Sequence, residues 1–240
     1  MEMFYRSLYS YSIAFQPHGF YMRKLIHPAL ALVFLLTTPV LCWTNEAVVK
    51  VGEFSRNQMS GWKAEEFEGL TDYSIQEVDG QRVLRANSRA AASGLYRKIR
   101  VDLWQYPYLN WRWKIDNRLP VRNETTKEGD DYPVRLYIVV DGKLRVWKTK
   151  SLNYVWSRGL SKGSAWPNAF ADNNVVMLSV RDGSDDTNRW YEEKRNVLQD
   201  VQRYLSPEIR YIDVVAIMTD TDNTHSFANS YYGDIYFSNQ

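Results

Sequence analysis

Three segments decide the fold: Tyr211-Ile-Asp-Val-Val-Ala-Ile-Met218, Thr219-Asp-Thr-Asp-Asn-Thr224 and Tyr231-Tyr-Gly-Asp-Ile-Tyr-Phe237. The first is a β-branched run typical of a buried strand, and the third alternates with the period of two that predicts a closing strand. The second is a polar loop of carboxylates, amides and hydroxyls. An acidic loop between two strands is either a capped turn or an oxygen-rich binding site.

The same strand pattern extends over most of the chain. Short β-branched and aromatic runs, separated by turn residues, recur from Val48 onward. Asp79-Gly80 joins two of these runs and predicts a hairpin, because this pair accommodates the positive φ of a type I′ turn. Leu109–Ile115 alternates apolar with polar side chains. We therefore predict an all-β fold, a jelly-roll-like antiparallel β-sandwich.

One segment departs from the β pattern. Its apolar residues recur at helical spacing from about 189 to 205, and Ser206-Pro207 would end a helix there. Asp186 or Thr187 could cap its start. We predict a single crossover helix over these residues, closing one end of the sandwich core.

Residues 1–42 have the pattern of a secretory signal with an upstream extension. Met22-Arg23-Lys24 is a basic start, and an apolar run follows from 29 to 41. This run is shorter than the roughly 20 apolar residues of a membrane helix. We therefore expect an exported protein, periplasmic or secreted, with no membrane span in the mature chain.

The cleavage site is predicted near Cys42 to Thr44. Leu41 stands where lipoprotein signals carry a small residue, so ordinary cleavage is favoured over lipid anchoring at Cys42. Residues 43–240 would then form a single β-sandwich domain, a length that matches one domain with a full core.

Charge and residue counts exclude several classes of chemistry. Of 30 Lys and Arg and 28 Asp and Glu, three basic residues and one acidic residue lie in the signal, so 27 of each remain. This balance predicts no nucleic-acid partner. Cys42 is the only cysteine and His225 the only histidine beyond the signal. Disulfides, thiolate nucleophiles and His-His metal pairs are thus excluded from the mature domain.

Several motifs carry a resemblance to a known family. They are Ala92-Ser-Gly-Leu-Tyr96, Leu109-Asn-Trp-Arg-Trp113, Gly129-Asp-Asp-Tyr132, Arg135-Leu-Tyr137, Tyr154-Val-Trp-Ser157 and Met218-Thr-Asp-Thr-Asp-Asn-Thr224. From about Val48 to Phe237 the chain resembles the family called domain of unknown function 3047, whose members look like exported bacterial proteins. The final Tyr232-Gly-Asp-Ile-Tyr-Phe237 is similar to the closing strand of carbohydrate-binding jelly rolls.

Strand alternation also predicts a polar sheet face. If Trp111 faces the core, Arg112 points the other way, and the same reasoning applies to later strands. The predicted ligand-binding residues are Arg112, Arg135, Tyr137 and Arg181 on strands, with Asp130, Asp131, Asp220, Asp222 and Asn223 in acidic loops around them. Arginine forks pair with carboxylates, so such a surface either satisfies itself or binds a sugar or uronic acid.

Two further features belong to this candidate site. Tyr154 and Trp156, beside a glycine-rich loop, could form a stacking platform for sugar rings, although aromatic side chains in sandwiches are mostly buried. Asp220 and Asp222, with Asp234, could bind Ca²⁺, which takes six to eight oxygen ligands. The EF-hand pattern is absent, and the same residue types also build turns.

Three functions remain open from the sequence. The leading hypothesis is an exported, non-catalytic β-sandwich that binds a saccharide or cell-envelope glycan. The second is a glycan hydrolase or lyase that uses Asp131 and Asp220 as its carboxylate pair. The third is a periplasmic interaction module that contacts a protein partner through an aromatic surface.

Overall fold

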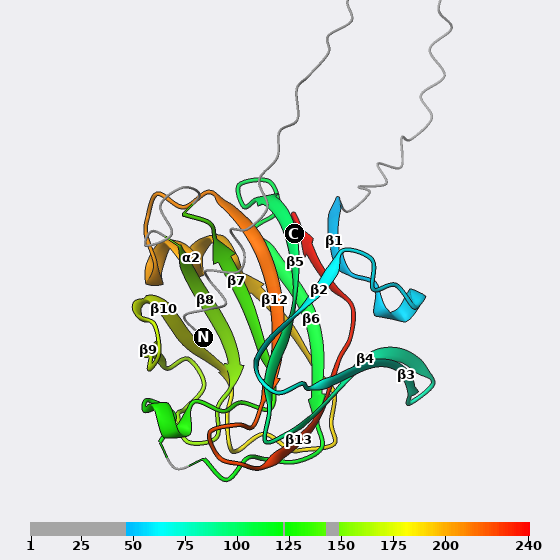
Figure 1. The fold of residues 1–240 in the computed structure, drawn as a ribbon. Coiled ribbons are helices and arrows are strands. Elements are labelled where there is room, and N and C mark those ends of the chain that lie inside the picture. Colours follow the sequence, from blue (N-terminus) through cyan, green and yellow to red (C-terminus); the bar gives the residue numbers. More distant parts are fainter. Residues whose placement is uncertain (1–46, 122, 143–148) are drawn as a thin grey trace, which may run out of the picture.

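The computed structural model describes residues 47–121, 123–142 and 149–240, and the predicted signal of residues 1–42 lies outside them. The described chain forms two seven-stranded β-sheets packed face to face (Figure 1). The predicted all-β sandwich is therefore confirmed. Within these residues no helix has the length and apolar character needed to cross a membrane.

Sheet A has the strand order β1-β14-β6-β13-β4-β3, with β11 on the other side of β6. Its strands are β1 (Val48–Gly52), β3 (Asp72–Val78), β4 (Gln81–Arg89), β6 (Tyr108–Ile115), β11 (Tyr191–Asn196), β13 (Phe227–Tyr232) and β14 (Ile235–Ser238). At the predicted hairpin between β3 and β4, Asp79 and Gly80 have φ values of 54° and 74°, as a type I′ turn requires.

Sheet B has the order β2-β5-β12-β7-β8-β10-β9. Its strands are β2 (Trp62–Glu68), β5 (Ala92–Asp102), β7 (Arg135–Val140), β8 (Lys150–Trp156), β9 (Ala165–Asn168), β10 (Asp172–Arg181) and β12 (Tyr211–Asp220). Two short 3₁₀ turns, η1 (Phe54–Arg56) and η2 (Lys127–Gly129), lie in loops. The predicted buried strand is β12, which pairs with both β5 and β7.

The sandwich is antiparallel except at one described pair. Strands β8 and β10 run parallel, and β9 pairs antiparallel with β10 at the sheet edge. Parallel neighbours need a long crossover connection, and the chain between Trp156 and Asp172 supplies it. The fully antiparallel prediction is corrected at this pair.

The predicted closing strand is split in two by a β-bulge. Tyr232 pairs with Trp113 and Tyr236 with Asn110, so four residue steps along β13 and β14 oppose three along β6. A bulge of this kind reverses which side chains face the core. Tyr232 is consequently buried, while Asp234 and Tyr236 come to lie on the outer face of the sheet.

The predicted helix over 189–205 is half as long as expected. Residues Tyr191–Asn196 form β11, and only Val197–Tyr204 forms the helix α2. The cap prediction is also wrong: the Asn196 side chain accepts a hydrogen bond from the Gln199 amide at 3.0 Å. The edge of β6 would otherwise expose unpaired backbone N–H and C=O groups. Strand β11 pairs with them, which a longer helix could not do.

Apolar side chains fill two layers, one on each face of sheet B. The core between the sheets contains Leu109, Trp111, Trp113, Ile115, Leu136, Tyr154, Trp156, Leu178, Ile217, Tyr232 and Phe237. A second apolar cluster on the other face of sheet B contains Tyr96, Tyr132, Tyr137, Val139, Trp166, Val175, Met177 and Met218. The outer face of sheet A instead carries polar side chains, and it holds the larger groove described next.

Candidate functional site

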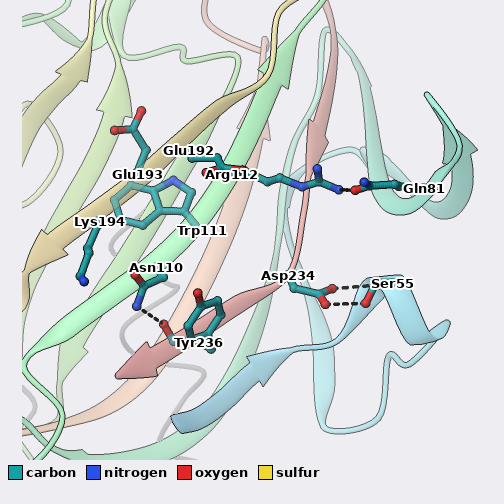
Figure 2. Close-up of a pocket in the computed structure, with 10 residues that line it drawn as sticks. All are labelled: Ser55, Gln81, Asn110, Trp111, Arg112, Glu192, Glu193, Lys194, Asp234 and Tyr236. Carbon is teal, nitrogen blue, oxygen red and sulfur yellow. Dashed lines mark hydrogen bonds between the residues drawn. The ribbon is translucent and has the colours of Figure 1, made fainter. Parts of the chain in front are cut away.

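A groove of about 560 Å³ lies on the outer face of sheet A (Figure 2). Strands β6, β11 and β14, the turn η1 and the β3–β4 hairpin supply its walls. The lining residues are Ser55, Gln81, Asn110, Trp111, Arg112, Glu192, Glu193, Lys194, Asp234 and Tyr236. Of the residues predicted to bind a ligand or metal, only Arg112 and Asp234 line this groove.

The strand register explains why these side chains meet. Asn110 on β6 pairs with Lys194 on β11 and with Tyr236 on β14. Two residues further along β6, Arg112 pairs with Glu192. Side chains that lie directly opposite in an antiparallel pair are close neighbours on the same face. The groove floor is therefore two rows of polar side chains across three strands.

Arg112 is fixed on three sides. Its Nη2 donates a hydrogen bond to Gln81 Oε1 at the hairpin (Figure 2). Its guanidinium carbon lies 4.7 Å from the centre of the Trp190 ring, a cation–π distance. The aliphatic part of its side chain crosses Gly233, where a Cβ atom would come within 2.4 Å of Arg112 Cγ. The bulge glycine thus leaves the space that Arg112 occupies.

The hairpin tip is tied to the same sheet face through Asp79. Its Oδ2 accepts hydrogen bonds from Trp190 Nε1 at 3.0 Å and from Lys114 Nζ at 3.1 Å. These two bonds lower the pKa of the Asp79 carboxyl, so the contact is between charged groups at neutral pH. The hairpin therefore forms a wall of the groove rather than a separate projection.

Asp234 is held at the opposite side of the groove. Its carboxylate accepts hydrogen bonds from the Ser55 amide at 2.8 Å and the Ser55 hydroxyl at 2.5 Å (Figure 2). The predicted metal set of Asp220, Asp222 and Asp234 is thereby corrected. Asp131, not Asp234, is the carboxylate that lies beside the other two.

The remaining acidic residues surround Arg135, away from this groove. Arg135 is fully buried on β7 and faces away from the core between the sheets. Its Nε lies 2.9 Å from Asp220 Oδ1, its Nη1 lies 3.3 Å from Asp130 Oδ2, and its guanidinium covers the Tyr132 ring. Burial raises the pKa of both carboxyls, and Arg135 opposes that shift. Arg135, Asp130 and Asp220 thus satisfy one another, as one of the two sequence hypotheses expected.

Three carboxylates at the edge of this cluster are close enough to share a cation. Oxygens of Asp131, Asp220 and Asp222 lie within 4.8 Å of one another. Asp131 accepts hydrogen bonds from the Asn223 amide at 3.2 Å and the Thr224 amide at 2.7 Å. Burial, and next the charge of Asp131, raise the pKa of Asp222. Calcium at this position stays a prediction.

The predicted polar face is in fact divided between two sheets. Arg112 lies on the outer face of sheet A, whereas Arg135 and Tyr137 lie on the buried outer face of sheet B. Alternation along one strand shows which side chains share a side of that strand. It does not show which sides of different strands form one face of the molecule. Tyr137 is 2% exposed and its hydroxyl lies 3.3 Å from the Met218 sulfur.

The predicted stacking platform is wrong. Tyr154 and Trp156 are 0% and 2% exposed because they fill the core between the sheets. The Tyr154 ring stacks on Trp111 at 5.3 Å, and its hydroxyl donates to Asp200 on α2 at 2.8 Å. Burial and the adjacent Asp200 raise the pKa of Tyr154 well above its ordinary value. Tyr154 therefore anchors the helix, and neither ring is accessible to a ligand.

Arg181 joins the two sheets instead of lining a site. On β10 of sheet B, its Nε lies 2.5 Å from Glu193 Oε1 on β11 of sheet A, and its Nη1 lies 3.2 Å from Asp185. Glu193 also accepts a hydrogen bond from Trp113 Nε1 at 3.2 Å. Arg181 therefore has a structural role.

Sequence reasoning missed most of the groove. Glu192 and Lys194 escape prediction because their segment is expected to be helical, and Tyr191-Glu-Glu-Lys-Arg-Asn196 shows no apolar alternation that would indicate a strand. Ser55 and Gln81 lie in a turn and at a strand end, where no periodicity indicates direction. The alternation of β6, which places Asn110 on the same side as Arg112, is the signal that indicates a further lining residue in advance.

The fold and groove define a β-sandwich with one polar, hollowed sheet face. The chain belongs to the family described as Protein of unknown function (DUF3047), whose sequence profile matches residues 60–236. This confirms the resemblance found from the sequence. No curated protein matches the chain.

Solved structures similar to this chain include a carbohydrate-binding module, an endoglucanase and a lectin. A carbohydrate-binding module of the β-sandwich superfamily has a TM-score of 0.40 and 10% identity over 78% of this chain, which spans 60% of that structure. Endoglucanase Cel12A from Rhodothermus marinus has a TM-score of 0.42 and 8% identity, covering 80% of this chain and 98% of its own. Winged bean acidic lectin, complexed with methyl-α-D-galactose, has a TM-score of 0.38 and 8% identity, covering 81% of this chain and 97% of its own. What this chain binds has to be inferred from its own side chains.

Proposed function

We propose that this protein is a non-catalytic saccharide-binding β-sandwich and that the groove on sheet A holds the sugar. The observation that carries the proposal is the set of convergent polar side chains fixed before any ligand binds. Arg112 is held by Gln81 and Trp190, and Asp234 is held by Ser55. Groups that are already ordered lose less conformational entropy on binding.

The chemistry of the lining suits a ligand rich in hydroxyl groups. A sugar hydroxyl both donates and accepts hydrogen bonds, and the amides of Asn110 and Gln81 do the same. Arg112 adds donors only, while Glu192 and Asp234 add acceptors. The ring of Tyr236, which also lines the groove, offers a surface for the apolar side of a sugar.

The burial of the predicted catalytic pair counts against turnover by these two residues. Asp131 and Asp220 are 1% and 2% exposed, and both are engaged by hydrogen bonds within the buried cluster. Glycoside hydrolysis needs two carboxyl groups that flank the scissile bond in contact with substrate. A hydrolase working in this groove would instead use two of the carboxylates that line it, Glu192, Glu193 and Asp234, and an assay for turnover tests this directly.

Export remains part of the proposal, because residues 1–42 have the signal pattern. Fractionation of expressing cells, with N-terminal sequencing of the exported form, should give a new terminus near Cys42 to Thr44. Recovery of only the uncleaved chain in the cytoplasm would contradict export.

The protein-interaction alternative requires a contiguous exposed apolar patch. Among the described residues, the large apolar side chains that are exposed are Val48, Leu70, Trp104 and Phe227. Single exposed apolar residues are normal on protein surfaces, so these four side chains do not by themselves define a partner surface. The saccharide therefore stays the proposed ligand.

The test is calorimetric titration of the purified protein with a panel of neutral oligosaccharides. Hydrogen bonds to charged groups contribute about 1.5–3 kcal/mol, so Arg112→Ala should weaken binding at least about tenfold. Arg89→Ala, an exposed arginine on β4 of the same sheet, is the matched control and should leave affinity unchanged. If no oligosaccharide binds, or if both variants behave alike, the groove is not the sugar site.

A further inference from the structure

A second hollow of about 520 Å³ lies at one end of the sandwich, where the loops after β6, β8 and β10 meet. It is lined by Arg118, Arg158, Gly159, Leu160, Ser161, Asp182, Gly183 and Ser184. None of these residues lines the groove on sheet A. The hollow is thus a separate feature with its own chemistry.

Neither of its two cations, Arg118 and Arg158, forms an ion pair with a carboxylate in the part of the chain that the structure describes. Among the described ion pairs, the arginines involved are others, including Arg135, Arg181 and Arg195. Arg118 donates one hydrogen bond, from Nη2 to the Asp185 carbonyl oxygen at 2.6 Å. A guanidinium carries five N–H donors, so both side chains keep donors available for a ligand.

Asp182, the one acidic residue in the lining, is already occupied. Its Oδ1 accepts hydrogen bonds from the Ser184 amide at 2.9 Å and hydroxyl at 2.6 Å, and its Oδ2 accepts one from the Lys162 amide at 2.8 Å. These donors lower the pKa of Asp182 and stabilise its charge within the loop. Asp182 therefore organises the loop and keeps its negative charge, and the two arginines leave the lining with a net charge of 2 − 1 = +1.

The backbone beneath the hollow is rigid. The buried Glu124 carboxylate accepts hydrogen bonds from the Arg158 amide at 2.5 Å and the Gly159 amide at 3.2 Å. A Cβ atom on Gly183 would lie 2.3 Å from the Arg158 carbonyl oxygen, so the two loops touch backbone to backbone. The attachment point of Arg158 is fixed, and only its side chain has to be ordered by a ligand.

We infer that this hollow is an anion-binding site for an oxyanion group, a carboxylate or a sulfate, with Arg118 and Arg158 as its donors. Two guanidinium forks match the geometry of such groups, and charge-assisted hydrogen bonds of this kind are among the strongest in proteins. A volume of about 520 Å³ exceeds the needs of one oxyanion, so there is room for a sugar ring that carries it. The inference does not depend on the proposed sugar groove.

The experiment is an NMR titration of backbone amides at constant ionic strength. Sodium sulfate and sodium glucuronate are the probes, and glucose is the neutral control. We expect saturable shifts at Gly159, Leu160, Gly183 and Ser184 with the anions and none with glucose. Shifts with glucuronate alone would assign a carboxylate on a sugar, and shifts with sulfate alone a sulfate group. Equal shifts with glucose, or no saturation with either anion, would overturn the inference.

Variants test the two arginines against a change in net charge alone. Arg118→Gln with Arg158→Gln should weaken anion binding at least about tenfold. Arg89→Gln with Arg203→Gln removes the same charge from exposed positions elsewhere and should retain affinity. Arg158→Lys, which keeps the charge but loses the fork, should bind more weakly than the wild type. If both double variants lose anion affinity equally, the effect comes from the net charge of the protein, and a specific site is contradicted. Arg112→Ala should leave this titration unchanged, whatever it does to the groove.

Discussion

Gly233 lies directly under the side chain of Arg112, and the Gly233 amide donates a hydrogen bond to the Arg112 carbonyl oxygen at 2.9 Å. The glycine belongs to the bulge between β13 and β14, where the chain gains one residue against β6. Its lack of a side chain, rather than an unusual φ, is what the position requires. The orientation of the groove arginine therefore depends on a residue of the neighbouring strand.

This relationship predicts the effect of Gly233→Ala. The new methyl group should push the Arg112 side chain off its path, weaken oligosaccharide binding about tenfold, and cost about 1–3 kcal/mol of unfolding free energy, as overpacking does. Calorimetric titration and chemical denaturation measure the two effects. Gly159→Ala is the control, because its nearest contact outside the adjacent chain is an ordinary 3.8 Å. Unchanged sugar affinity in Gly233→Ala would contradict the role given to Arg112.

The buried Arg135 predicts a large loss of stability on truncation. Arg135→Met leaves Asp130 and Asp220 without their cation, and breaking a buried pair in this way costs about 3–5 kcal/mol. The exposed pair of Arg100 and Asp213 gives the comparison, because Arg100→Met should cost no more than about 1 kcal/mol. Urea denaturation of both variants decides the matter, and similar losses would refute the buried-cluster account.

Calcium binding by the three clustered carboxylates can be tested directly. A cation held by Asp131, Asp220 and Asp222 binds only the folded state and should raise the melting temperature as its concentration increases. Asp222→Asn should reduce that response, whereas Asp234→Asn should retain it, because Asp234 is bonded to Ser55 instead. Melting in calcium and in EDTA gives the comparison. If the wild type melts at the same temperature in calcium and in EDTA, the protein does not bind calcium at this site.

Stability should fall steeply at alkaline pH. Burial raises the pKa of Tyr73, Tyr132, Tyr154 and Tyr232 above the ordinary phenol value of about 10. The folded state therefore keeps phenolic protons that the unfolded state loses, so the free energy of unfolding is unaffected below about pH 10 and declines above it. Denaturation monitored by tyrosinate absorbance tests this coupling. Tyr154→Phe should make the decline shallower, and tyrosine ionisation without unfolding would contradict it.

The sequence predicted the sandwich well because its strongest signals are local. The β-branched β12 and the Asp79-Gly80 turn specify their own backbone conformation, whatever surrounds them. The helix predicted over 189–205 is wrong in its first half, because residues 189–196 carry too few apolar side chains to show either period. There the open edge of β6, which no local pattern reveals, selects the strand.

The candidate site was harder to predict, for a related reason. Alternation placed Arg112 and Arg135 correctly on the sides of their strands that face away from the core between the sheets, yet those sides belong to opposite faces of the molecule. Tyr154 and Trp156 look like an accessible pair in sequence, and packing between the sheets buries them. Which strands adjoin is a property of the whole topology, and only the topology assembles the groove.

The pairing of Arg181 with Glu193 has a mechanical consequence for that groove. Strand β11 is an edge strand, and edge strands are the elements most easily detached from a sheet. Its inner side chain Glu193 is bound to the opposite sheet, while its outer side chains Glu192 and Lys194 line the groove. Peeling β11 away from β6 would separate a partly buried charge pair as well as the strand ladder. The β11 wall of the groove is therefore held to both sheets and does not open independently when a ligand binds.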